Sequence, residues 1–222
     1  MLFIAGFGFE IPNEDFRFES VPEQTPILLT LLKVFPEEND SRYLRLGANR
    51  REEVNQELAS QTDPVVQFLN NVCEQSTNTV DTACRVFDCL GSLLLNPLIV
   101  TDHLANSKLL QSILVLLRDS KANSQLHDRA TDCICQALFL CEDFNKHKTL
   151  AHVLYDGVHA LAEPFHLCVA QEDLDKLHNY SRLYTELAES LLSAIVDTPN
   201  MDLGQLATID LLLGAVGYHD YT

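Results

Sequence analysis

The chain has 222 residues and a formal net charge of −17, and 46% of its residues are hydrophobic. This length suffices for one domain with a sizeable core, and the hydrophobic content excludes a disordered chain. The surplus of acidic residues argues against direct nucleic-acid binding, because a polyanion needs a basic surface, and it favours basic protein partners.

Residues 1–24 are the first part of the chain, and we predict an irregular N-terminal segment there. The segment opens with the apolar run MLFIAGFGF and reaches Glu10 after only nine residues. This run is too short to span a bilayer, and it lacks the basic start of a secretory signal. We therefore expect no membrane segment and no cleaved leader.

Residues 25–222 are predicted to be helical, because apolar residues recur at i, i+3 or i+4, and i+7. Helix starts predicted near residues 78, 123 and 172 lie 45 and 49 positions apart, and each interval holds two helices. This period is typical of HEAT or armadillo repeats, in which each helix pair buries its apolar face against its neighbours. We predict an all-α fold, an α-α superhelix (HEAT/armadillo-like solenoid) of about four helix pairs, in preference to a helical bundle.

Prolines punctuate this helical pattern. Pro36, Pro97 and Pro199 fall where the periodicity predicts that a helix has ended. Pro164 instead lies inside a helical pattern, so we expect a kink or a break near residues 162–163.

The seven cysteines are predicted to be reduced thiols of the core. Their number is odd, they lie inside apolar stretches, and no pair has the spacing of a zinc site or a redox motif. Free buried cysteines indicate the cytosol or the nucleus, where disulfides are rare.

The best candidate for metal or acid–base chemistry is the series His152, His159 and His166, spaced seven residues apart. On a helix these rings lie about 10 Å apart along the axis and opposite the apolar stripe, too far apart for one ion. We expect them to face solvent, with an enzyme that uses the three histidines as the rival hypothesis. Familiar catalytic and phosphate-binding motifs are missing, so we predict a protein that is not an enzyme and has no catalytic, cofactor or metal residues.

The segment SRYLRLGANRREEV, residues 41–54, concentrates positive charge in this acidic chain, with Arg42, Arg45, Arg50 and Arg51. We expect these arginines to pair with neighbouring glutamates and to bond the carbonyls at helix C-termini. The alternative is that they contact a partner, because arginine is well suited to carboxylate and phosphate groups.

Four blocks carry a resemblance to a known family: SRYLRLGANRREEV, CRVFDCLGSLL, LHDRATDCICQALF and VAQEDLDKLHNYSRLYTELAESLLSAIV. In this order and spacing the chain closely resembles the transportin-SR type of nuclear import receptor, in the importin-β (karyopherin) family. The resemblance runs from about residue 25 to the end and covers an internal segment of such a receptor. Residues 1–24 do not match it.

The resemblance implies a superhelix of HEAT repeats that binds cargo and releases it when Ran-GTP binds. It implies SR-type splicing factors as cargo, nucleoporins as further partners, and shuttling between cytoplasm and nucleus. For the four arginines it adds Ran and phosphate-bearing cargo as candidate contacts. The alternative function is a truncated HEAT-repeat scaffold or decoy without transport activity.

Charge is distributed unevenly along the chain. Residues 130–222 contain fourteen acidic and four basic residues, which leaves a formal charge of −10. An acidic face on a helical repeat suits basic segments of partner proteins, and the alternative is a face that is merely solvated.

Overall fold

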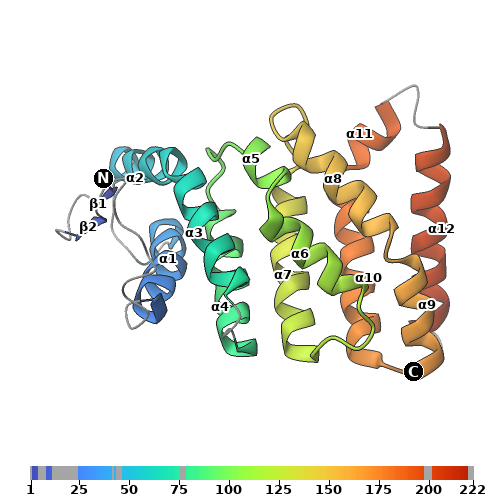
Figure 1. Ribbon diagram of the computed structural model, residues 1–222. Coiled ribbons are helices and arrows are strands. Elements are labelled where there is room, and N and C mark those ends of the chain that lie inside the picture. Colours follow the sequence, from blue (N-terminus) through green and yellow to red (C-terminus); the bar gives the residue numbers. More distant parts are fainter. Residues whose placement is uncertain are drawn as a thin grey trace. The chain divides into compact units, whose positions relative to one another are not determined.

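The computed structural model describes residues 2–4, 9–11, 25–41, 43, 47–75, 79–197 and 202–219 (Figure 1). These residues form twelve helices and one pair of short strands. They belong to two compact units, residues 1–100 and 101–222, which are described separately below.

The first unit contains a strand pair and four helices. The strands β1 (Leu2–Ile4) and β2 (Phe9–Ile11) are antiparallel, with Leu2 opposite Ile11. The helices are α1 (Thr25–Asp40), α2 (Ala48–Ser60), α3 (Thr62–Glu74) and α4 (Val80–Leu93). Helix α4 begins where Thr79 accepts a hydrogen bond from the Thr82 amide, and it buries its apolar face against α1 and α3.

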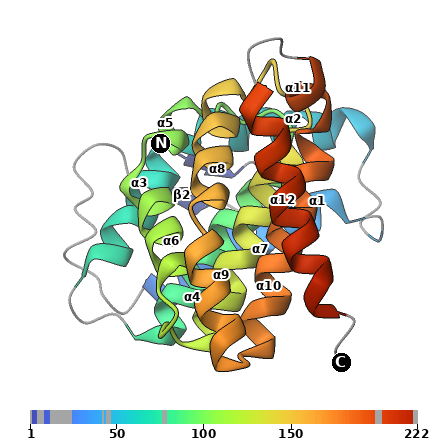
Figure 2. The same cartoon turned by 90° about the vertical axis from the view of Figure 1, so that its right-hand side faces the viewer.

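The second unit is a run of eight helices. They are α5 (Asp102–Ala105), α6 (Lys108–Arg118), α7 (Ser124–Leu140), α8 (Lys148–His159), α9 (Ala162–Gln171), α10 (Leu174–Ser190), α11 (Leu192–Asp197) and α12 (Asp202–His219). Helix α10 contacts both α7 and α12, and Figures 1 and 2 show these helices side by side. None of the helices among the described residues has both the length and the apolar character needed to cross a membrane.

Local sequence signals set the turns between paired helices. Asn123 caps α7 by accepting a hydrogen bond from the Leu126 amide at 3.2 Å. Between α9 and α10, Glu172 takes the left-handed conformation (φ 56°) that ends α9. The next residue, Asp173, caps α10 by accepting a hydrogen bond from the Lys176 amide at 3.2 Å.

These pairs confirm the predicted all-α fold of HEAT-type helix pairs. The helix starts predicted near residues 78, 123 and 172 are found at residues 80, 124 and 174. The domain division at residue 24 stays a prediction, because most of residues 1–24 lie outside the described part and the remainder contribute β1 and β2.

The prolines behave differently from one another. Pro97 lies outside a helix as predicted, and Pro199 lies outside the described residues. Pro164 is confirmed as the site of a break, because α8 ends at residue 159 and a new helix, α9, begins at residue 162. Pro164 lies in the first turn of α9, where backbone amides have no partner within the helix, so its missing N–H costs no hydrogen bond.

The prediction for Pro36 was wrong, since α1 continues through it to Asp40. Pro36 is buried, and α1 packs along α4. The amide of Ser41 bonds the carbonyls of Glu37 and Glu38 at 3.0 and 3.2 Å, so the helical turn is completed beyond the proline. Tertiary packing here overrides a local breaking signal whose cost is roughly 3 kcal/mol in an isolated helix.

Candidate functional site

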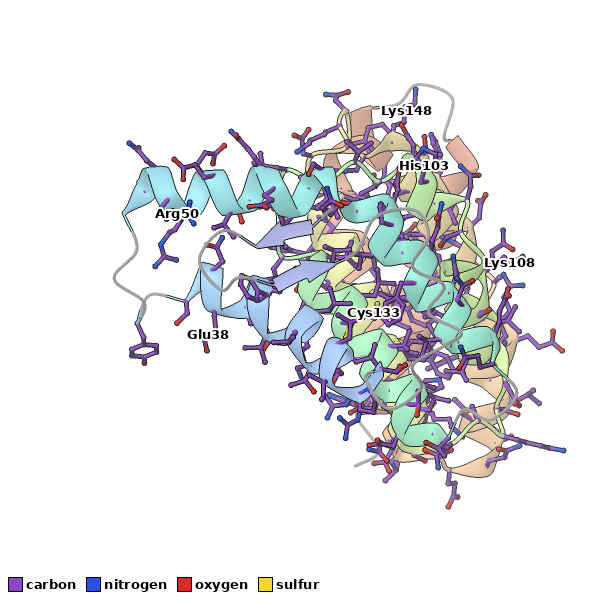
Figure 3. All side chains as sticks on the ribbon, turned by 60° about the vertical axis from the view of Figure 1, so that its left-hand side comes forward. Glu38, Arg50, His103, Lys108, Cys133 and Lys148 are labelled. Atoms are coloured by element: carbon purple, nitrogen blue, oxygen red, sulfur yellow. The ribbon has the colours of Figure 1, made fainter. Side chains whose placement is uncertain are left out.

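The predicted arginine site is only partly within the described residues. Arg42 and Arg45 lie outside them. Arg50 projects from the first turn of α2 (Figure 3), and its Nη1 is 2.8 Å from Oε2 of Glu53 on the same helix. Arg51 donates from Nη2 to the carbonyl oxygen of Ser41 at 2.7 Å and from Nη1 to the carbonyl oxygen of Asn39.

Arg51 therefore closes the C-terminal end of α1, whose last carbonyls have no partner within the helix. The side-chain amides of nearby asparagines form further hydrogen bonds beside Arg51. The side chain of Asn39 donates to Oδ1 of Asn55 at 2.7 Å, and Asn96 donates to the Asn55 carbonyl at 2.7 Å. These bonds are of the structural kind expected for the arginines, while a partner-binding role for the four remains a prediction.

The three candidate histidines do not share one helix. His152 and His159 lie on α8 and His166 on α9, and His152 and His166 are exposed as expected. His159 is half-buried and lies 2.8 Å from the Tyr155 carbonyl through Nδ1 and 3.2 Å from the Thr208 hydroxyl through Nε2. It therefore joins α8 to α12, which corrects the expectation that it faces solvent. Within the described ranges, three or more His, Cys, Asp or Glu side chains nowhere gather closely enough to hold a metal ion.

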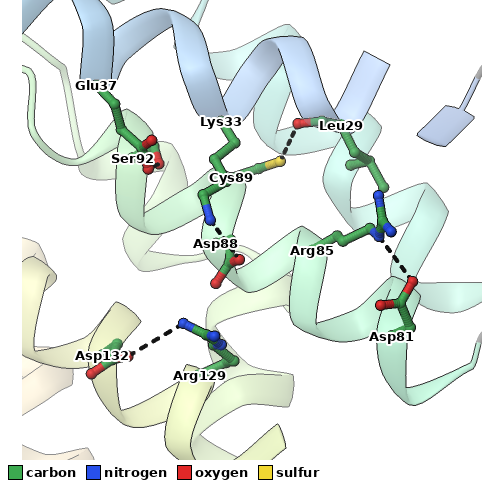
Figure 4. Close-up of polar contacts among 10 residues, drawn as sticks. All are labelled: Leu29, Lys33, Glu37, Asp81, Arg85, Asp88, Cys89, Ser92, Arg129 and Asp132. Atoms are coloured by element: carbon green, nitrogen blue, oxygen red, sulfur yellow. Dashed lines mark hydrogen bonds and ion pairs between the residues drawn. The ribbon is translucent and has the colours of Figure 1, made fainter. Parts of the chain in front are cut away.

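In the first unit, polar contacts tie α1 to α4 (Figure 4). Lys33 lies 2.9 Å from Asp88, and the Ser92 hydroxyl donates to Glu37 at 2.7 Å. The thiol of Cys89 donates to the Leu29 carbonyl at 2.9 Å, and burial raises the pKa of this thiol to about 12. Cys89 is thus a neutral core group, as predicted. All seven cysteines are free thiols, but only five are buried, and Cys73 and Cys135 are half-buried, which corrects the prediction that all seven belong to the core.

In the second unit, the parallel helices α7 and α10 enclose an open pocket of about 350 Å³, here called the α7–α10 groove. Its lining consists of Cys135, His178, Ser181, Arg182, Thr185 and Glu186. One wall is fixed by Arg182, whose Nη2 donates to Oδ1 of Asp132 on α7 at 2.6 Å. The second oxygen of Asp132 lies 3.9 Å from Nη1 of Arg129.

The surroundings of the groove shift the pKa values of Arg182 and Cys135. Partial burial acts to lower the pKa of Arg182, but the hydrogen bond to Asp132 and nearby acidic charge outweigh it and raise that pKa. Burial, assisted by Glu186 and Asp132 and opposed by Arg182, raises the pKa of the Cys135 thiol to about 12. Arg182 is thus a permanent cation, and Cys135 is a neutral thiol without nucleophilic character.

Buried polar contacts join α10 to α6, to the turn between α6 and α7, and to α7 itself. The Tyr180 hydroxyl donates to the Leu117 carbonyl at 2.8 Å, and Lys176 donates from Nζ to the Ser120 carbonyl at 2.7 Å. Asn179 lies 3.3 Å from Nδ1 of His127, whose pKa is lowered to about 4 by burial and then by Lys176. The contact between Asn179 and His127 helps to fix the register of α10 against α7.

Sequence reasoning had not singled out this groove. A signal was present, because positions 178, 181, 182, 185, 186 and 189 of α10 are all polar and follow helical spacing. Taken alone, this polar stripe is typical of the solvent-exposed face of any surface helix. Only the packing of α10 against α7 shows that it forms one side of a depression.

Comparison with protein families gives two matches. Residues 14–134 match the family model described as Exportin 1-like protein. Residues 172–222 match the model described as Transportin-3/Importin-13 second TPR domain. Both stretches cover parts of the chain that the structure builds from helix pairs, the unit shared by TPR and HEAT repeats.

Proposed function

Because the chain belongs to the family of exportin 1-like proteins and is of the transportin type of karyopherin, we propose that it acts in nuclear transport by binding proteins. The observation that carries this proposal is the family match over residues 14–134, more than half of the chain. Proteins of this family are nuclear transport receptors. The helix pairs of both units suit this role, since repeats of this kind offer extended faces to partner proteins.

In more detail, the proposal is import of SR-type splicing factors regulated by the GTP-bound form of Ran. The receptor binds its cargo in the cytoplasm, contacts nucleoporins during passage, and releases the cargo in the nucleus when Ran-GTP binds. Its action is binding without catalysis. The family match and the resemblance of the four sequence blocks support this account.

A binding experiment with two arms tests the proposal. The full chain is immobilised, and its affinity is measured for Ran loaded with a non-hydrolysable GTP analogue and for Ran loaded with GDP. The second arm measures the affinity for an SR-type splicing factor with and without GTP-bound Ran. The proposal predicts a preference for GTP-bound Ran and weaker cargo binding in its presence. Cargo binding that ignores Ran would support the scaffold or decoy function instead.

A further inference from the structure

We propose that α10 locks two successive helix pairs into one cooperative block by capping the C-terminal end of α6, and that α12 opens separately from this block. The locked block consists of α6, α7, α9 and α10. The proposal does not rest on the proposed function, because it concerns which parts of the second unit open together, whatever the chain binds. Three buried side chains of α10 carry it: Lys176, Asn179 and Tyr180.

These three side chains lie on one face of α10, because their positions are three and four residues apart. Each is at most 4% exposed, and each makes a polar contact with the helix pair that precedes α9 and α10 in the chain. A small displacement of α10 would break these contacts before water could replace them. Because unpaired polar groups are costly in a buried site, the junction resists partial opening.

Two of the contacts satisfy carbonyl groups at the end of α6. Leu117 is among the last four residues of this helix, whose carbonyls lack partners within it, and its carbonyl accepts from the Tyr180 hydroxyl at 2.8 Å. Ser120 follows two residues after the end of α6, and its carbonyl accepts from Nζ of Lys176 at 2.7 Å. A cationic ammonium here also complements the negative end of the helix dipole. Part of the cap of α6 is thus supplied by the next helix pair.

The surroundings of the two donors favour these bonds. Nζ of Lys176 lies 3.1 Å from Oδ2 of Asp173, the residue that caps α10. Partial burial acts to raise the pKa of Asp173, but the hydrogen bonds and the charge of Lys176 outweigh it and lower that pKa, so the carboxylate is the anionic partner of the ammonium. Burial raises the pKa of Tyr180 above its usual range, which keeps the hydroxyl protonated as a donor.

Helix α12 is held differently. Its printed polar contact is the one between the Thr208 hydroxyl and Nε2 of the half-buried His159, at 3.2 Å. Of the side chains that the structure describes on α12, only Thr208 and Ala215 are buried. Three apolar side chains of this helix are at least half exposed: Ile209, Leu213 and Val216. An element that buries so little apolar surface opens at a lower free energy than its neighbours, so we expect α12 to detach while the locked block stays closed.

Native-state hydrogen exchange of the full chain, read by mass spectrometry at urea concentrations below the unfolding transition, tests the proposal. Peptides from α6, α7 and α10 should exchange through one shared opening and so show the same dependence on urea. Peptides from α12 should exchange at least about tenfold faster, with a weaker dependence on urea. Separate urea dependences for α6–α7 and α10, or exchange of α12 together with the block, would overturn the proposal.

Two variants test the contacts themselves. Tyr180→Phe and Lys176→Met each remove a donor while retaining most of the side-chain volume. The matched control is Tyr184→Phe, which removes a buried hydroxyl of the same helix for which the described residues provide no hydrogen-bond partner. Lys148→Met is the second control, because it removes an exposed ammonium of the same unit.

Both test variants should speed exchange of peptides that cover residues 116–127 by about fivefold or more and should separate the urea dependence of α6–α7 from that of α10. The controls should leave these rates within about twofold. Circular dichroism confirms that each variant is folded, and Tyr180→Phe, the more conservative change, decides the test if Lys176→Met does not fold. Equal effects of Tyr180→Phe and Tyr184→Phe, or unchanged exchange in Tyr180→Phe, would overturn the proposal.

Discussion

The carboxylate of Asp132 on α7 accepts a hydrogen bond of 2.6 Å from the guanidinium of Arg182 on α10. The two side chains are 44% and 37% exposed. They join parallel helices of successive helix pairs, and Arg182 lines the α7–α10 groove. Because water screens a pair this exposed, its main effect is to fix the geometry of the groove, with a small contribution to stability.

A double-mutant cycle measures this contribution. We predict that Arg182→Ala and Asp132→Ala each lower the free energy of unfolding only modestly, with a coupling energy of about 1 kcal/mol or less. Urea denaturation of the four proteins at low and high salt gives the coupling, which should shrink as salt is added. A coupling energy above about 2 kcal/mol would mean that the pair is a major source of stability.

The adjacent residues Arg50 and Arg51 should respond differently to truncation. Arg51→Ala removes the donor to the carbonyls of Asn39 and Ser41, and we expect it to lower the free energy of unfolding by about 1–2 kcal/mol. Arg50→Ala breaks an exposed pair with Glu53 and should cost less than about 0.5 kcal/mol. Chemical denaturation of both variants checks the order, and a larger loss for Arg50→Ala would contradict the roles that the structure gives the two residues.

Residues 41–54 show how far the sequence could predict this region. Their composition and position next to acidic residues and helix ends predicted local pairing of the arginines. Which arginine closes α1 could not be predicted, because it depends on how α2 returns along α1 and brings Arg51 to the carbonyls of Asn39 and Ser41.

The same distinction holds for the groove and for Pro36. Helical spacing predicted both α7 and α10, but the register that places Asp132 beside Arg182 spans fifty residues and is set by buried contacts such as that between His127 and Asn179. Local rules likewise predicted a helix end at Pro36, and packing of α1 on α4 overrode them. Periodicity thus predicts elements, whereas their mutual contacts depend on the whole core.

Buried His127 should make stability depend on pH. Its pKa falls from 6.5 to about 4 on folding, because burial disfavours the charged ring. Between these values the unfolded chain holds the extra proton, so the free energy of unfolding falls as the pH drops from about 6.5 to about 4, by up to roughly 1.4 kcal/mol per pH unit. Above about pH 7 the ring is neutral in both states and contributes no pH dependence.

Denaturation as a function of pH tests this prediction. His127→Gln should flatten the curve between pH 6.5 and 4, leaving the slope from other groups such as His147, whose pKa burial also lowers. The exposed His152 provides the control, and His152→Gln should preserve the slope of the original protein. An unchanged slope in His127→Gln would contradict a buried neutral ring at this position.

Two helical glycines form a matched pair for a packing test. A Cβ atom at Gly157 on α8 would lie 2.9 Å from both terminal carbons of the buried Leu114, whereas at Gly214 on α12 it would have no neighbour within 4 Å. We predict that Gly214→Ala stabilises the protein by about 0.5–1 kcal/mol through helix propensity. Gly157→Ala should destabilise it by about 1 kcal/mol, because overpacking exceeds the same gain. The unfolding midpoints of the two variants in thermal denaturation check these predictions. If both variants were stabilised equally, the Leu114 side chain would be able to move aside with little loss of free energy.

The most direct test of the transport account is the nuclear accumulation of a cargo complex too large to diffuse through the pore. The chain is fused to a bulky inert reporter and added to permeabilised cells with an SR-type splicing factor, GDP-loaded Ran and an energy source, and nuclear fluorescence is recorded against the reporter alone. The account predicts accumulation of fusion and cargo that is lost when Ran is locked in its GTP-bound form. Exclusion of the fusion from the nucleus, at the level of the reporter alone, would contradict a role in transport.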